Sequence, residues 1–160
     1  MPIDMQKRIQ TAFDYATMYT FRKMIMLELS PISGGHYAAQ PGDYLGTIML
    51  SGDIAGHCTL CLSEEIARTA ITRLTGETME GIDGICDGVG EFANMIAGNA
   101  KATLQEFHVS LSMPKVVCFN GGEDVPSMSP RSIQLTYTSE IGNIGICIDL
   151  TCSQQSDSNG

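Results

Sequence analysis

A stripe of apolar residues at helical spacing runs through the middle of the chain, from about Glu80 to Phe107. The apolar residues that share this face are Ile85, Val89, Phe92, Ile96, Ala100 and Leu104. On a wheel of about 3.6 residues per turn, Asp87, Glu91 and Asn94 fall together on the opposite side. The pattern therefore predicts a long helix that packs on a core through one face and displays a carboxylate and an amide on the other.

Two glycines, Gly90 and Gly98, lie on or beside the polar face of this helix. A glycine inside a helix is less favourable than alanine by about 1 kcal/mol. One physical reason to keep them is that another surface approaches the helix closely at these positions. From the residue pattern alone, however, the simplest interpretation of Asp87, Glu91 and Asn94 is an ordinary solvated helix face.

The rest of the chain is predicted to form two further helices and several strands. Apolar spacing predicts a first helix from Ile3 to about Met24, and a short helix follows Ser63, which is suited to cap its start, and ends at Gly76. Strands are predicted at 25–29, 44–50, 58–62, 109–113, 116–119, 133–138 and 144–150.

The length and charge of the chain limit its organisation and its partners. We expect one domain over residues 1–152 and a disordered polar tail over 153–160. The net charge of −9 would repel a polyanion, which argues against nucleic acid as a partner. No apolar stretch is long enough to span a bilayer and no basic leader precedes an apolar run, so we expect a cytoplasmic protein without a membrane contact.

The cysteines pose a separate question, because Cys58 and Cys61 have CxxC spacing beside His57. This stretch is predicted to be a strand, in which residues three apart point to opposite faces and cannot easily bind one metal. The six cysteines are also too sparse for a disulfide scaffold. We interpret them as small residues that fill the core, and expect no metal site.

The run from Gly90 to Lys101, GEFANMIAGNAK, closely resembles the signature of the CheC/CheX/FliY family of chemotaxis phosphatases. The family motif is Asp or Ser, three residues, Glu, two residues and Asn, which corresponds here to Asp87, Glu91 and Asn94. Stretches 50–56, 74–77 and 111–114 are also similar to the CheX group. CheC-like members repeat ExxN on the first helix, where this chain has Asp14, Met18 and Phe21, so the resemblance implies one site per chain.

The resemblance implies a fold and an activity. The fold is α+β, with a mostly antiparallel sheet packed by the long active-site helix and two further helices. The activity is hydrolysis of the phosphoaspartate of a CheY-like response regulator. Asn94 would orient the attacking water and Glu91 would anchor a lysine of the receiver domain, as catalytic residues, while Asp87, Gly98 and Lys101 would contact the partner.

The same resemblance implies that the chain needs no cofactor of its own, because the partner receiver domain supplies Mg²⁺. It further implies a homodimer that pairs through its sheets, and the apolar strands 133–138 and 144–150 could offer an uncovered edge for this pairing. Two alternatives remain open. One is a docking module, related to the flagellar switch proteins, that binds a response regulator without hydrolysis, and the other is an unrelated enzyme with a similar helix face.

Overall fold

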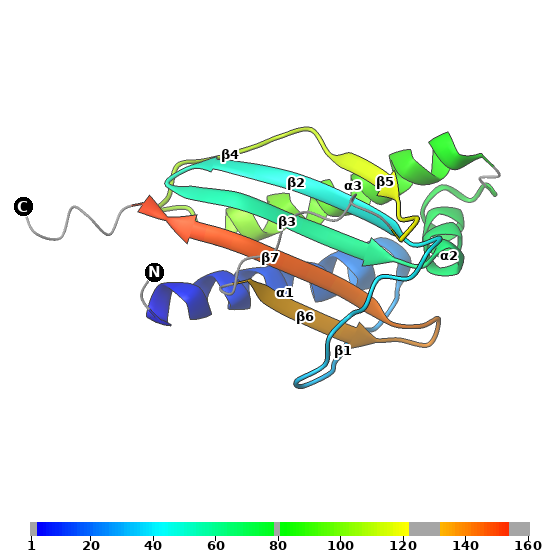
Figure 1. Cartoon of the computed structure of the whole chain (residues 1–160), viewed down its shortest axis with the longest axis horizontal. Helices are drawn as coiled ribbons and strands as arrows, with labels where there is room; N and C mark the ends of the chain where they lie inside the picture. Colours follow the sequence, from blue (N-terminus) through cyan, green and yellow to red (C-terminus); the bar gives the residue numbers. More distant parts are fainter. Residues whose placement is uncertain (1–2, 79–80, 122–131, 154–160) are drawn as a thin grey trace, which may run out of the picture.

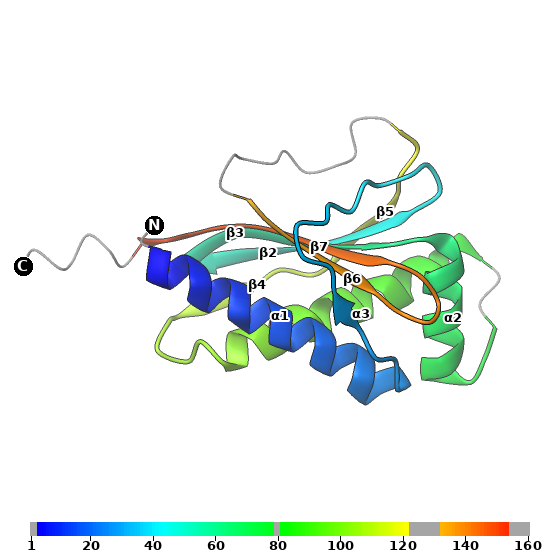
Figure 2. The same cartoon turned by 90° about the horizontal axis from the view of Figure 1, so that it is seen from below.

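The computed structural model describes residues 3–78, 81–121 and 132–153, which form one sheet with helices on one of its faces (Figures 1 and 2). The elements in chain order are α1 (Ile3–Ile25), β1 (Ser30–Pro31), β2 (Tyr44–Gly52), β3 (Ile54–Leu62), α2 (Glu64–Thr75), α3 (Ile82–Ala102), β4 (Val109–Leu111), β5 (Lys115–Cys118), β6 (Ile133–Thr138) and β7 (Ile144–Cys152). The α+β fold predicted from the sequence is confirmed. None of the described helices is long and apolar enough to cross a membrane.

The sheet has seven strands, and every pairing in it is antiparallel. Its order is β1-β6-β7-β3-β2-β4, and β5 pairs with β2 beside β4. Two hairpins, β2–β3 and β6–β7, are joined where β3 pairs with β7. The long strands β2, β3 and β7 thus form the centre of the sheet, onto which the helices pack.

The active-site helix predicted from the sequence lies on β2, where Gly46 leaves room for it. A Cβ atom at Gly46 would lie 3.2 Å from Val89 Cγ1 and 3.3 Å from Ala93 Cβ, so a larger residue would crowd α3 at this contact. The predicted apolar face is confirmed, since Ile85, Val89, Phe92, Ile96, Ala100 and Leu104 are all buried. The opposite face of α3 is therefore turned away from the sheet.

Helix α1 holds α3 from the side. The rings of Phe21 and Phe92 stack with their centroids 5.2 Å apart and both are fully buried. Beside this stack, at the preceding residue of α1, Asn99 Nδ2 donates a hydrogen bond of 3.0 Å to Thr20 Oγ1. An apolar contact and a polar contact together fix the position of α3 relative to α1.

Helix α2 has the ends that the sequence predicts. Ser63 accepts a hydrogen bond of 3.2 Å from Ile66 N, and Gly76 closes the helix with a left-handed φ of 76°. The helix packs against α3 at Gly88, where a Cβ atom would lie 2.3 Å from Ile71 Cγ1. Gly88 is thus required for the close approach of α2 and α3.

The predicted strand at 25–29 is wrong. Ile25 ends α1, Met26 has a positive φ of 56°, and Leu27 N bonds back to Phe21 O. Leu27 and Leu29 are buried between exposed neighbours, which is the alternation that suggested a strand. The segment nevertheless pairs with no strand in the described part of the chain, and only Ser30 and Pro31 join the sheet.

The long helix is shorter than the sequence suggested. Residues 79 and 80, at its expected start, lie outside the described residues, and its last residue is Ala102 instead of Phe107. After Ala102 the backbone tightens, because Thr103 N bonds Ala100 O and Leu104 N bonds Lys101 O, each three residues back. Leu104 is buried from this turn, which explains why it continued the apolar pattern. Of the predicted tail 153–160, all but Ser153 lies outside the described residues.

The edge predicted for strand pairing is also different. Strand β7 lies inside the sheet between β3 and β6, so it offers no edge. The free side of β6 is partly covered, because β1 pairs with Tyr137 and Thr138 and Ile32 N donates to Thr136 O. Pro31 in β1 lacks an N–H group and further limits pairing there.

The glycines of α3 give a test of this packing. We expect Gly88→Ala to lower the free energy of unfolding, because its new Cβ would overlap the Ile71 side chain. Gly98→Ala is the matched control, since no atom lies within 4 Å of its new Cβ. It should raise the free energy of unfolding by about 0.5–1 kcal/mol through helix propensity. Urea unfolding of the two variants measures both, and equal stabilities would contradict the packing described for α2 and α3.

Candidate functional site

The outward face of α3 carries three polar side chains predicted to act together. Asp87, Glu91 and Asn94 are all exposed. Within the described part of the chain, Glu91 and Asn94 have no hydrogen-bond or ion-pair partner. Residues three and four apart on a helix are neighbours, with Cβ atoms about 5–6 Å apart, so the three side chains can contact one ligand together. Their carboxylates and amide are available for an external partner.

These side chains form one wall of a groove of about 660 Å³. The helix wall consists of Cys86, Asp87, Gly90, Glu91 and Asn94. The facing wall is formed by the end of β4, the following turn and β5: Leu111, Ser112, Met113, Pro114 and Val116. The groove therefore has a polar side from the helix and a mainly apolar side from the strands.

The two walls meet at Gly90. A Cβ atom there would lie 3.1 Å from Pro114 Cγ and 3.4 Å from Val116 Cγ2. The sequence predicted that some surface approaches the helix at this glycine, and within the chain that surface is Pro114. Gly98 is different, because its position opens into free space.

The structure brings together only some of the predicted partner-binding residues. Asp87 lies in the groove beside Glu91 and Asn94. Gly98 and Lys101 follow on later turns of α3 and are not among the groove residues, although Lys101 is exposed. Lys101 and Gly98 can contact a partner only if that partner extends beyond the groove along the helix.

Ser112 holds the strand wall in place. Its backbone N–H donates to Met49 O, its Oγ accepts from Met49 N, and its hydroxyl donates to Met113 O at 2.9 Å. The residue before a proline is restricted to extended conformations, so Pro114 fixes the backbone of Met113. The turn that faces the helix is therefore rigid.

The groove contains no activated nucleophile in the part of the chain that the structure describes. Burial raises the pKa of the Cys86 thiol, and the nearby carboxylates of Asp83 and Asp87 add to this effect, so the thiol stays protonated. The Ser112 hydroxyl is engaged in hydrogen bonds at both ends. Such a site can bind a cation through a carboxylate and orient a water through an amide.

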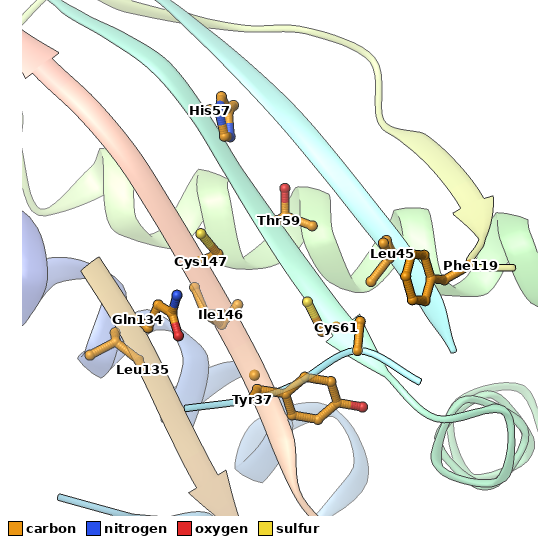
Figure 3. Close-up of a pocket in the computed structure, with 12 residues that line it drawn as sticks. Tyr37, Leu45, His57, Thr59, Cys61, Phe119, Gln134, Leu135, Ile146 and Cys147 are labelled. Carbon is orange, nitrogen blue, oxygen red and sulfur yellow. The ribbon is translucent and has the colours of Figure 1, made fainter. Parts of the chain in front are cut away.

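A second cavity, of about 250 Å³, lies on the face of the sheet away from the helices (Figure 3). Its lining is mainly apolar, and burial raises the pKa of its Cys61 thiol to about 12. Cys58, by contrast, is buried in the core cluster, so the two cysteines of the CxxC point to opposite faces as predicted. Within the described ranges, no cluster of three His, Cys, Asp or Glu residues could hold a metal ion.

One group in this cavity stands out, because His57 Nδ1 is buried without a hydrogen-bond partner among the described residues. The other polar groups are engaged, since Tyr37 donates to Asp43 at 2.9 Å and Thr59 bonds Thr47 at 2.9 Å. The cavity therefore lacks the set of free polar groups that α3 presents.

The first helix does not repeat the site. Asp14 accepts a hydrogen bond of 2.6 Å from Tyr137, and Phe21 is buried in its stack with Phe92. Met18 is partly buried against the core. These three positions, at the spacing of a second motif, serve the packing of the domain.

The strand wall could not be assigned to the site from the sequence. Stretch 111–114 is similar to the CheX group, but nothing in a single sequence places it opposite Glu91. The available signals were a small residue, Gly90, beside polar residues of a helix and a proline, Pro114, after a short strand. Neither signal shows that these two residues lie in contact.

Comparisons with known proteins concern the family and the fold of the chain. The family model described as chemotaxis phosphatase CheX matches residues 44–133, which is more than half of the chain. The crystal structure of chemotaxis protein CheX from Vibrio vulnificus is 28% identical, with a TM-score of 0.77 over 89% of this chain and 96% of that one. A search of curated proteins found no significant match.

Two further structures share the fold at lower identity. The CheX of the CheX-CheY-BeF3-Mg²⁺ complex from Borrelia burgdorferi is 18% identical, with a TM-score of 0.73 over 88% of this chain and 96% of that one. The FliM middle domain from H. pylori is 12% identical, with a TM-score of 0.61 over 92% of each chain.

The two asparagines of α3 allow a test of the site by stability alone. Asn94 has no partner in the described residues, and alanine is the better helix former, so Asn94→Ala should raise the free energy of unfolding by a few tenths of a kcal/mol. Asn99→Ala removes the hydrogen bond to buried Thr20 and should lower it by about 1 kcal/mol. Thermal or urea unfolding checks both, and a destabilising Asn94→Ala would mean that Asn94 has a structural role.

Proposed function

Because the chain belongs to the CheX family of chemotaxis phosphatases, we propose that it hydrolyses the phosphoaspartate of a CheY-like response regulator. The observation that carries the proposal is the exposure of unpartnered Glu91 and Asn94, side by side in the groove of α3. Neither side chain is bonded within the described part of the domain, so both can contact a partner without breaking an internal contact. The Borrelia structure, a complex with CheY, supports a receiver domain as the partner.

In the proposed mechanism, Asn94 orients a water molecule. Its carboxamide can donate and accept at the same time, so it can hold a water in line with the phosphorus atom. The water oxygen forms a bond to phosphorus as the bond from phosphorus to the aspartyl oxygen breaks. The products are the free aspartate and inorganic phosphate.

Glu91 is proposed to anchor the receiver. One turn from Asn94 on the same helix, its carboxylate can pair with a lysine beside the phosphoaspartate and fix the angle at which the amide enters. Asp87 lies one turn before Glu91 in the same groove and can extend this contact. Gly98 and Lys101 are proposed to meet the rim of the partner further along α3.

The Mg²⁺ of the reaction is proposed to arrive with the receiver domain, where it neutralises charge on the phosphoryl oxygens. The chain itself contributes the two side chains of α3 and a rigid surface. The negative groove also suits a partner whose site presents a lysine and a metal cation.

Single substitutions separate chemistry from docking. Asn94→Ala should lower stimulated dephosphorylation by about 10²–10³, as loss of one preorganised polar group does, while binding of the phosphorylated receiver is retained. Glu91→Ala should lower both the rate and the affinity, because the partner lysine loses the carboxylate that pairs with it. Loss of one member of such a charge pair costs about 2–5 kcal/mol of binding free energy. Decay of phosphorylated receiver and binding of the receiver with BeF3⁻ and Mg²⁺ measure these effects.

Asn99→Gln is a suitable control, since this amide lies at the α1–α3 contact outside the groove. Full activity of Asn94→Ala would contradict water positioning. In that case the docking module related to flagellar switch proteins, consistent with the fold shared with FliM, would be the better function.

We also propose a homodimer, formed through the face of the sheet away from the helices. Met49 is 51% exposed on this face, next to the apolar cavity around Leu45. Pairing there would leave the groove of α3 free, because α3 covers the other face (Figure 2).

The mass of the particle in solution tests the dimer. Light scattering at micromolar concentration should give twice the 17.2 kDa of one chain. Met49→Glu should shift the mass toward the monomer, because the interface would bury an unpaired charge. Met26→Glu changes an exposed residue after α1 and should leave the mass unchanged. A wild-type mass of one chain would contradict the dimer, and a dimeric Met49→Glu would contradict this interface.

A further inference from the structure

The strand wall of the groove carries an exposed apolar side chain. Met113 is 87% exposed, although it lies within the groove residues beside Glu91 and Asn94. A single exposed apolar residue is common on protein surfaces and needs no explanation. Three features of its surroundings make Met113 different.

The first feature is a rigid backbone. Ser112 forms hydrogen bonds with Met49 and with Met113 O, and Pro114 restricts Met113 from the other side. Pro114 is in turn pressed against α3 at Gly90. A side chain presented from a fixed backbone loses less freedom when it binds, which favours a contact residue.

The second feature is continuity. Half-buried Leu111 and Val116 line the groove behind Met113, so an apolar strip runs along the strand wall opposite the polar strip of α3. A partner that enters the groove between these strips contacts Met113 as well as Glu91 and Asn94. The third feature is chemistry, because the unbranched thioether side chain adapts to irregular apolar surfaces.

We propose that Met113 is an affinity and specificity residue for the receiver domain, and that it inserts into an apolar depression beside the phosphorylated aspartate. This inference rests on the proposed function and specifies its partner. The receiver then has two complementary features, a lysine that meets Glu91 and an apolar depression that meets Met113. The contact fixes how tightly the receiver docks and leaves the chemistry to Asn94.

The test compares Met113→Ala with Met26→Ala, the same substitution at an equally exposed methionine, 85%, that is not among the groove residues. The probe is a CheY-like receiver domain of the same organism, phosphorylated for kinetics and loaded with BeF3⁻ and Mg²⁺ for binding. Met113→Ala should raise the KM and the Kd by about tenfold, as loss of an interface hot spot does, with kcat unchanged. Met113→Leu should restore most of the affinity, and Met26→Ala should change nothing.

Salt dependence distinguishes an apolar contact from a structural effect. The ratio of Kd between Met113→Ala and wild type should be the same at low and high ionic strength, whereas the ratio for Glu91→Gln should shrink as salt screens the charge pair. An unchanged Kd for Met113→Ala, or a fall in kcat with KM unchanged, would overturn the proposal.

The two proposals fail in different ways. If wild type binds the BeF3⁻-loaded receiver without accelerating loss of phosphate, the phosphatase function falls, and the Kd values still decide the role of Met113. If wild type does not bind this receiver at all, both proposals fall.

Discussion

The close packing of α3 on β2 at Gly46 determines where the polar side chains of α3 lie. Because glycine leaves no side chain between them, Val89 and Ala93 rest directly on the strand, and the helix cannot rotate without losing that fit. The stack of Phe21 on Phe92 restricts α3 from the side of α1. With its inner face fixed in this way, the helix presents its polar face in one orientation, and no flexible loop has to be ordered for the site to form.

Much of the fold could be predicted from the sequence, where the signal is local. The apolar period of α3, the caps of α2 at Ser63 and Gly76, and the alternation of β7 each arise from neighbours along the chain. Strand order could not be predicted, because pairing depends on contacts between distant segments. This is why β7 was expected near an edge but lies inside the sheet, and why the alternation at 25–29 suggested a strand that finds no partner.

The same limit of prediction from one sequence applies even more to the site. Helical spacing placed Asp87, Glu91 and Asn94 on one face, and the family resemblance assigned their roles. The helix also contains an asparagine and a glycine with structural roles. Asn99 forms a hydrogen bond with Thr20, and Gly88 leaves room for the Ile71 side chain. A single sequence does not distinguish these from Asn94 and Gly98, because the difference lies in what each meets across the fold. The strand wall was missed for the same reason, as Pro114 and Gly90 are far apart in the sequence and adjacent only in space.

The residues of α1 at the spacing of a second motif are used inside the domain, and this bears on how many sites each chain carries. Since the Asp14 carboxylate is bonded inside the domain and Phe21 is covered by Phe92, the α1 face holds no second copy of the polar pair displayed by α3. Under the proposed function each chain is therefore a monovalent ligand: its occupancy should follow a simple hyperbola, and the described helices offer one receiver site per chain. A gain in avidity then requires that two or more chains associate. Because association depends on protein concentration, the avidity would depend on it as well.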